Sequence, residues 1–263
     1  MLIKVSTVFI MFASIVLANN IDVKSIMHDV KWREDGVSRF AEVTLKIIDK
    51  DGSYRERTVD YIEKDEDMKR STILYVKSPR DVMRTTILLS NDSSNDTNTI
   101  SNIWLYIPVL GKTKKLSEQN KNGNFVGSNF QYSDLEWTIL EDFSYKLLGE
   151  EEINGEKTYK IEAKAVNKNV VDKTSYSKKI LWINPLYNLV VQADYYNKND
   201  FYTKRLTVNK IKKIDGFWTV TKQTVENFLE EQTSIMSLNN VKYNKKISNK
   251  VFRRQSLGKK YRW

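Results

Sequence analysis

Residues 40–47 read Phe40-Ala41-Glu42-Val43-Thr44-Leu45-Lys46-Ile47, and apolar and polar side chains nearly alternate along them. A period of two is typical of a β-strand with one buried and one exposed face. Similar segments recur along most of the chain, at residues 54–62, 71–76, 86–89, 103–107, 157–163, 178–183, 189–196, 203–210, 217–225, 233–238 and 241–247. The sequence therefore predicts a mainly β protein.

Turn-forming dipeptides separate several of these segments: Asp51-Gly52, Asn122-Gly123, Asn154-Gly155 and Asp215-Gly216. Such pairs tolerate positive φ and favour tight hairpins, so we expect antiparallel strands in a meander. Helical patterns are confined to residues 20–32, which Asn20 or Asp22 would cap, and to a short helical or lid segment near residues 133–140. No linker or internal repeat divides the chain, so we expect one domain over residues 19–263.

A large antiparallel sheet has two edges to protect. Curving the sheet into a barrel or half-barrel removes most of this problem and creates a concave interior. The interior is then either filled by side chains or left open for an apolar ligand, and composition alone leaves both alternatives open.

Composition excludes several classes of enzyme. The 263 residues contain no cysteine and a single histidine, His28. This removes thiol nucleophiles and argues against zinc hydrolysis or a histidine-based triad. Gly111-Lys112-Thr113 lacks the upstream glycine of a phosphate loop, because Tyr106 stands in its place, and no serine elbow is present. We therefore expect a protein that is not an enzyme, with no catalytic residue, metal or cofactor.

The N-terminus has the features of a secretory signal. Lys4 precedes an apolar stretch at residues 5–17, and small residues lead to a predicted cleavage after Ala18. The alternative is an uncleaved anchor, but the stretch is shorter than the ~20 apolar residues of a membrane span and contains Ser6, Thr7 and Ser14. We expect residues 1–18 to be removed and the remainder to be exported. The net charge of +10 could suit a nucleic acid, but the predicted export and the lack of a nucleic-acid-binding motif argue against this partner.

The middle of the chain carries a dense motif. It runs through Trp104-Leu105-Tyr106-Ile107-Pro108, then Lys112, Lys114 and Lys115, then Gly123-Asn124-Phe125-Val126-Gly127-Ser128-Asn129-Phe130-Gln131-Tyr132-Ser133-Asp134-Leu135. This pattern resembles the outer-membrane lipoprotein-sorting protein family, the LolA-like periplasmic proteins, and the similarity extends over roughly residues 40–257. One departure is Thr85, where the family usually has glycine, which suggests a different bulge or closer side-chain filling.

The resemblance implies a fold and a function. The fold is a LolA/LolB-like curved antiparallel sheet, an unclosed half-barrel, with short helices as a lid over an apolar cavity. The function is a periplasmic binding or carrier protein for lipid or for the acyl chains of lipoproteins. The alternative is an accessory or lipid-sensing subunit of an inner-membrane transporter of the resistance-nodulation-division (RND) type that shuttles no cargo itself.

Two sets of residues are candidates for the site. Aromatic side chains that could line the cavity, or simply fill the core, are Trp104, Tyr106, Phe125, Phe130, Tyr132, Trp137 and Trp182. Basic side chains that could contact an anionic membrane surface or a protein partner are Lys112, Lys114, Lys115, Arg253 and Arg254. The alternative for the lysines is protection of a sheet edge, and for the arginines a last strand with a frayed end.

Overall fold

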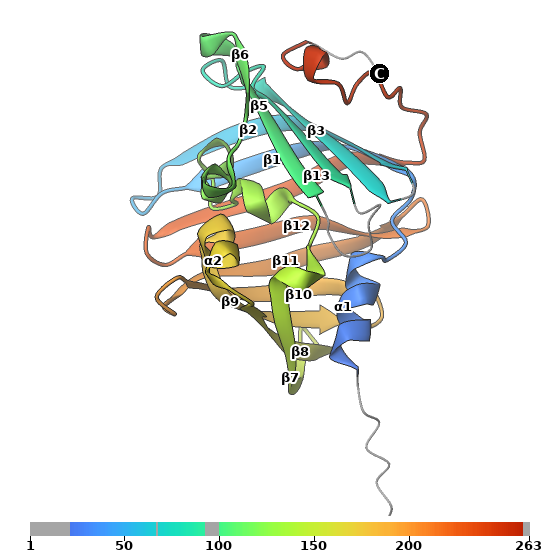
Figure 1. Cartoon of the computed structure of the whole chain (residues 1–263), viewed down its shortest axis with the longest axis vertical. Coiled ribbons are helices and arrows are strands. Elements are labelled where there is room, and N and C mark those ends of the chain that lie inside the picture. Colours follow the sequence, from blue (N-terminus) through green and yellow to red (C-terminus); the bar gives the residue numbers. More distant parts are fainter. Residues whose placement is uncertain (1–21, 67, 93–99, 260–263) are drawn as a thin grey trace, which may run out of the picture.

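The computed structural model describes residues 22–66, 68–92 and 100–259, and these form one large curved sheet (Figure 1). The predicted signal sequence at residues 1–18 lies outside the described residues. The two α-helices are α1 (Val23–Lys31) and α2 (Lys168–Thr174). The thirteen strands are β1 (Ser38–Ile48), β2 (Tyr54–Glu66), β3 (Lys69–Ser78), β4 (Thr86–Asp92), β5 (Ile100–Ile107), β6 (Lys112–Lys115), β7 (Phe143–Ile153), β8 (Glu156–Ala165), β9 (Tyr176–Asn184), β10 (Leu189–Asn197), β11 (Tyr202–Ile214), β12 (Phe217–Asn227) and β13 (Gln232–Tyr243).

The strand order explains how the sheet is built. Strands β1 to β6 run in sequence to one edge, strands β13 back to β7 run to the other, and β1 pairs with β13 in the middle. The edge strands β6 and β7 are not paired with each other among the described residues, so the sheet is an unclosed, all-antiparallel half-barrel. This confirms the predicted fold class.

Local signals account for most boundaries. Asn154-Gly155 and Asp215-Gly216 adopt the positive φ values that tight hairpins require, as predicted. Helix α1 begins after Asp22, whose carboxylate accepts a hydrogen bond from the Lys24 amide at 3.0 Å. Its apolar side packs on the sheet through Val23, Ile26, Met27 and Val30.

Some predicted elements differ from the structure. The segments 233–238 and 241–247 are one strand, β13, which ends where Asn244 adopts a φ of 54°. Asn122-Gly123 does not form a hairpin turn. Gly123 ends a 3₁₀ turn (Glu118–Asn122), and its φ of −68° is not the positive value that such a turn requires. For residues 133–140 the prediction was a short helical or lid segment, and the structure has part of a 3₁₀ turn at Tyr132–Leu135 there and no α-helix. Strand β7 and helix α2 are not among the predicted elements.

The sheet buries side chains on both faces over strands β2 to β5. On the concave face the core includes Val59, Leu74, Ile87 and Ile103, and on the outer face Ile62, Ile73 and Leu88 form a second cluster. The C-terminal segment, residues 244–259, covers this second cluster through Ile247, Val251, Phe252 and Leu257. Arg84 fastens the segment, since its guanidinium donates to the Gly258 carbonyl at 3.0 and 3.2 Å.

Candidate ligand cavity

A long connection between the two edge strands covers the concave face. Residues 116–142 leave β6 at one edge and reach β7 at the other, and four 3₁₀ turns interrupt their path (Figure 1). We call this segment the strap. Because the strap joins the two unpaired edges, it crosses the open side of the half-barrel and forms a roof over the interior.

The tip of the strap inserts two aromatic rings into the core. The Phe125 amide donates to the Phe130 carbonyl at 2.7 Å, and Val126 and Gly127 take positive φ between them. This tight turn directs both rings inward, where Phe125 is 1% and Phe130 3% exposed. Burial of two phenyl rings contributes several kcal/mol to holding the roof in place.

Asn129 connects the strap to the centre of the sheet. Its side-chain amide donates to the carbonyls of Val225 at 3.3 Å and Gln232 at 2.8 Å, and its backbone amide donates to the Ser234 hydroxyl at 3.0 Å. The Lys204 ammonium donates to the Asn129 carbonyl at 3.1 Å. The strap is therefore held by specific polar contacts as well as by apolar packing.

Lys121 anchors the strap near its start. Its side chain is 1% exposed, and its ammonium lies 2.8 Å from Glu118 and 2.8 Å from Glu136. It also donates to the Ser101 carbonyl of β5 at 2.9 Å. A buried ammonium with two carboxylates and a carbonyl is well compensated. No local pattern of residues indicates that this lysine is buried.

Two neighbouring cavities lie beneath the strap. The first has a volume of about 260 Å³ and lies between α1, the end of the strap and the inner face of β7 to β11. The second, of about 200 Å³, lies on the inner face of β1 to β4 and is roofed by Phe125 and Leu135. Gln223 lines both, so they adjoin.

The first cavity also opens toward solvent beside α1. A third, more open cavity of about 470 Å³ shares Met27, Phe143 and Tyr145 with it. Small side chains in the floor, Ala163 and Ala193, leave room that larger residues would fill. The three cavities thus follow one another from the α1 edge to the interior of the half-barrel.

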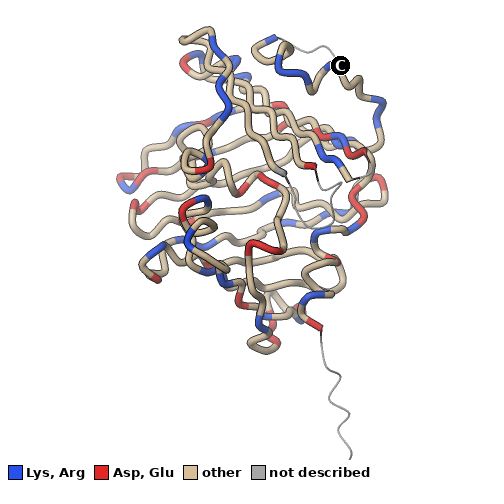
Figure 2. Tube along the Cα trace, viewed as in Figure 1, with Lys and Arg blue, Asp and Glu red and all other residues tan. Residues whose placement is uncertain are grey.

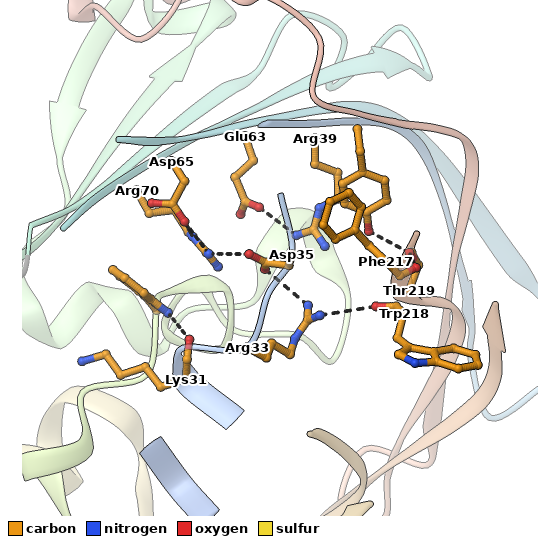
Figure 3. Close-up of polar contacts among 12 residues, drawn as sticks. Lys31, Arg33, Asp35, Arg39, Glu63, Asp65, Arg70, Phe217, Trp218 and Thr219 are labelled. Carbon is orange, nitrogen blue, oxygen red and sulfur yellow. Dashed lines mark hydrogen bonds and ion pairs between the residues drawn. The ribbon is translucent and has the colours of Figure 1, made fainter. Parts of the chain in front are cut away.

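A cluster of charged side chains borders the second cavity (Figure 3). Arg33 lies 3.3 Å from Asp35, and Arg70 bridges Asp35 at 2.9 Å and Asp65 at 2.6 Å. Arg39 pairs with Glu63 at 3.0 Å. These pairs neutralise the guanidinium groups at the cavity wall.

The arginines of this cluster lower the pKa of the Glu63 carboxyl. Burial opposes ionisation of this carboxyl, but Arg39, Arg70 and the hydrogen bond from the Tyr61 hydroxyl outweigh burial and lower its pKa. Glu63 is therefore a carboxylate in the folded protein near neutral pH. Arg39 Nε nevertheless has no hydrogen-bond partner among the described residues.

The predicted aromatic residues fall into two groups. Four lie on the concave side: Trp137 lines the first cavity, Phe125 lines the second, and Phe130 and Tyr132 pack in the core beside it. Trp137 is held at the rim, since its indole lies 4.7 Å from the Trp32 ring and 4.7 Å from the Arg70 guanidinium carbon. Its indole N–H donates to the Lys31 carbonyl at 3.3 Å.

The other three lie on the outer face, away from these cavities. Trp104 and Tyr106 pack with Ile73 and Leu257, because their neighbours Ile103 and Leu105 occupy the inner face of β5. Trp182 packs with outer residues of β9 to β11 and donates its indole N–H to Glu151 at 2.6 Å. Thr85, the departure from the family pattern, lies between β3 and β4 and lines none of the cavities described above.

The predicted basic residues gather at one end of the molecule. Lys112, Lys114 and Lys115 belong to the fully exposed edge strand β6, next to the C-terminal segment that carries Arg253 and Arg254 (Figure 2). Lys115 is the cross-strand neighbour of Trp104, and the Arg254 guanidinium lies 4.5 Å from the centre of that ring. The tail arginines lie in a coil and a 3₁₀ turn (Arg254–Ser256), not in a last strand.

Two features are absent from the described part of the chain. No group of three or more His, Asp or Glu side chains within it is placed to hold a metal ion. None of its helices is both long enough and apolar enough to cross a bilayer.

Comparisons with known proteins give a family and a set of similar structures. A family model described as an uncharacterized protein matches residues 68–259. No curated protein matches the chain.

Three crystal structures resemble 89% of the chain. A DUF1329 family protein from Desulfovibrio piger is 25% identical, with a TM-score of 0.80 over 98% of that protein. A putative outer membrane lipoprotein-sorting protein domain from Vibrio parahaemolyticus is 21% identical, with a TM-score of 0.80 over 97% of that chain. A LolA superfamily protein from Nitrosomonas europaea is 18% identical, with a TM-score of 0.68 over 98% of that chain. The last two likenesses show that the fold is LolA-like.

Proposed function

The chain belongs to the uncharacterized protein family whose model matches residues 68–259, and from this premise we propose that it is a non-catalytic periplasmic carrier of lipid or of acylated protein. The observation that carries the proposal is the roofed concave face, which keeps adjoining cavities beside its packed core. The similarity of fold to a putative lipoprotein-sorting domain supports the same function.

The energetics of an acyl chain suit such a cavity. Each buried methylene contributes about 0.8 kcal/mol, so a chain of about 16 carbons gains roughly 13 kcal/mol on leaving water. A bilayer offers nearly the same gain, so the cavity needs only to match the bilayer for cargo to exchange. Cavities with incomplete packing meet this requirement better than a rigid, closely fitted pocket.

The third cavity suggests an entry route for cargo, and the exposed basic residues suggest a binding surface for a membrane or a protein partner. The third cavity beside α1 supplies an opening to the first, and α1 is a short helix that could move as a lid. The exposed lysines of β6, with Arg253 and Arg254, present positive charge for an anionic membrane surface or an acidic partner, such as an inner-membrane transporter of the RND type. Cleavage after Ala18 would release the carrier into the periplasm.

Native mass spectrometry of residues 19–263 purified from the periplasm tests this function. We expect a near-stoichiometric mass adduct that organic extraction removes and that fragments as a phospholipid, fatty acid or acylated peptide. A bare protein that also leaves the emission of an added fluorescent fatty acid unchanged would contradict carriage. That result would favour an accessory subunit that binds a transporter without cargo, which affinity capture from solubilised membranes would then test.

A further inference from the structure

Lys179 stands out among the side chains that line the first cavity. It lies on the inner face of β9, where its ammonium is 5.1 Å from the ring centres of Phe143 and Tyr176 and 5.5 Å from that of Tyr195. No hydrogen bond or ion pair joins this ammonium to another of the residues that the structure describes. Burial lowers the pKa of Lys179, as expected for an ammonium without a close counter-ion.

The other charged groups that line this cavity already have partners. Glu136 lies 2.8 Å from Lys121, and Asp142 lies 2.9 Å from Lys173. Asp134 accepts hydrogen bonds from the Gln131 amide and the Tyr176 hydroxyl, and lies 3.9 Å from Lys204. Each acid thus has its ion pair with a cation other than Lys179. Lys179 is therefore a lysine of this lining that has no carboxylate within ion-pair distance among the described residues.

A second unused donor lies nearby. Tyr145 of β7 pairs with Ala163 of β8, and Ala163 pairs with Lys179 of β9, so these three residues form one row across the inner face. Neighbouring strands are about 4.8 Å apart, which places the backbones of Tyr145 and Lys179 roughly 10 Å apart with only a methyl group between them.

The Tyr145 hydroxyl is suited to donate a hydrogen bond. It is buried and has no hydrogen-bond partner among the described residues. Burial, with Glu141 and Asp142 nearby, raises the pKa of Tyr145, so the hydroxyl keeps its proton. Two donors without acceptors therefore flank the space above Ala163. Buried polar groups are normally satisfied, so an acceptor is expected there.

We propose that the first cavity binds a long acyl chain that ends in a carboxylate, with one carboxylate oxygen on Lys179 Nζ and the other on Tyr145 Oη. This deepens the proposed carrier function and rests on it. The chain would extend past Gln223 into the second cavity, which Val43, Val59, Leu74, Leu89 and Met236 line. A carboxylate would bring one negative charge beside Asp134 and Asp142, whereas a phosphate dianion would bring two.

Competition binding on delipidated residues 19–263 tests the proposal. The probe is N-phenyl-1-naphthylamine, a neutral fluorophore, and the competitors are hexadecanoate, methyl hexadecanoate and hexadecyl phosphate. A hydrogen bond to a charged group favours hexadecanoate over its methyl ester by roughly 10- to 100-fold in the wild type. Lys179→Met removes this preference but still binds the ester, and Tyr145→Phe reduces the preference.

Lys178→Met is the matched control, because Lys178 is the neighbouring residue on the opposite face of β9, with its ammonium over the Tyr196 ring. We expect Lys178→Met to keep the full preference for hexadecanoate over its methyl ester. Equal binding of acid and ester by the wild type, or a preference that survives Lys179→Met, would overturn the carboxylate site while leaving a lipid cavity intact. Stronger binding of hexadecyl phosphate than of hexadecanoate would overturn the carboxylate assignment. If no competitor displaces the probe, the carrier function itself fails.

Discussion

Glu63→Gln removes the carboxylate from the charged cluster beside the second cavity and keeps the size of the side chain. Arg39 then loses its ion pair at 3.0 Å while its side chain stays only 15% exposed. Breaking one side of a buried pair costs about 3–5 kcal/mol, because the remaining charge is left uncompensated. For a protein of this size each kcal/mol lowers the unfolding temperature by about 2–4 °C, so we expect a fall of roughly 6–20 °C.

The assay is thermal unfolding followed by circular dichroism at neutral pH. Glu66→Gln is the control, because Glu66 lies on the same strand and also pairs with a cation, Lys64, but its side chain is 48% exposed. We expect the control to unfold at the wild-type temperature, since exposed pairs are screened by solvent. Equal unfolding temperatures for Glu63→Gln and Glu66→Gln would show that the buried Arg39–Glu63 pair does not stabilise the fold.

The same variant has a defined pH dependence. Because the pKa of Glu63 is lowered in the folded state, its ionised form stabilises the fold above the unfolded pKa of about 4.3, and this stabilisation is lost as pH falls through the folded pKa. The difference in stability between wild type and Glu63→Gln is therefore constant near pH 7 and shrinks below about pH 4. A gap that widens on acidification would contradict the ionised state assigned to Glu63.

Three further predictions concern the roof and the outer face. Phe130→Ala removes a ring that is 3% exposed and lowers the free energy of unfolding by about 3–5 kcal/mol, measured by urea denaturation. Asn129→Ala leaves the carbonyls of Val225 and Gln232 without their donor, which costs about 1–3 kcal/mol for each buried group left unsatisfied. We expect faster hydrogen exchange of the strap amides, and unchanged exchange there would argue against this anchor. Gly258→Ala places a methyl group against the Tyr106 ring at a residue whose φ is +76°, so we expect the C-terminal segment to detach. Trypsin should then cleave faster after Arg253 and Arg254. Wild-type cleavage rates would show that other contacts hold the segment.

The sheet could be predicted because its central strands alternate regularly. In β1, Ala41, Val43, Leu45 and Ile47 all face the core, and hairpin dipeptides mark several strand ends. Edge strand β7 is harder to predict, because none of its side chains is fully buried and the strand ends in a run of acidic residues. The sequence of strand β13 predicts two segments instead of one, because polar residues interrupt its apolar pattern near Asn239 and Asn240.

The face of each aromatic residue was harder to predict for a physical reason. Where both faces of a strand are covered, apolar residues occupy both sides and the period of two is lost, as in β3 and β9. Trp104, Tyr106 and Trp182 lie on such strands, and their outward orientation depends on packing that no local pattern encodes.

The row from Tyr145 through Ala163 to Lys179 was likewise beyond sequence reasoning. The row depends on the register of three strands. The acids near Lys179 that pair with other groups include Asp134, which lies in the strap and not in the sheet.

Acyl-chain binding on the concave face is tested most directly by filling the floor of the first cavity. Ala193 lines this cavity, whereas its neighbour Gln192 pairs with Trp182 on the outer face, so Ala193→Phe and Gln192→Phe place the same ring on opposite sides of β10. If the ring displaces three methylenes at about 0.8 kcal/mol each, affinity falls by roughly 50-fold. Titration of delipidated protein with a fluorescent fatty acid should therefore give saturable binding for wild type and Gln192→Phe, and binding weakened by this factor for Ala193→Phe. Equal affinities for all three proteins, or no saturable binding by the wild type, would contradict a ligand cavity beneath the strap.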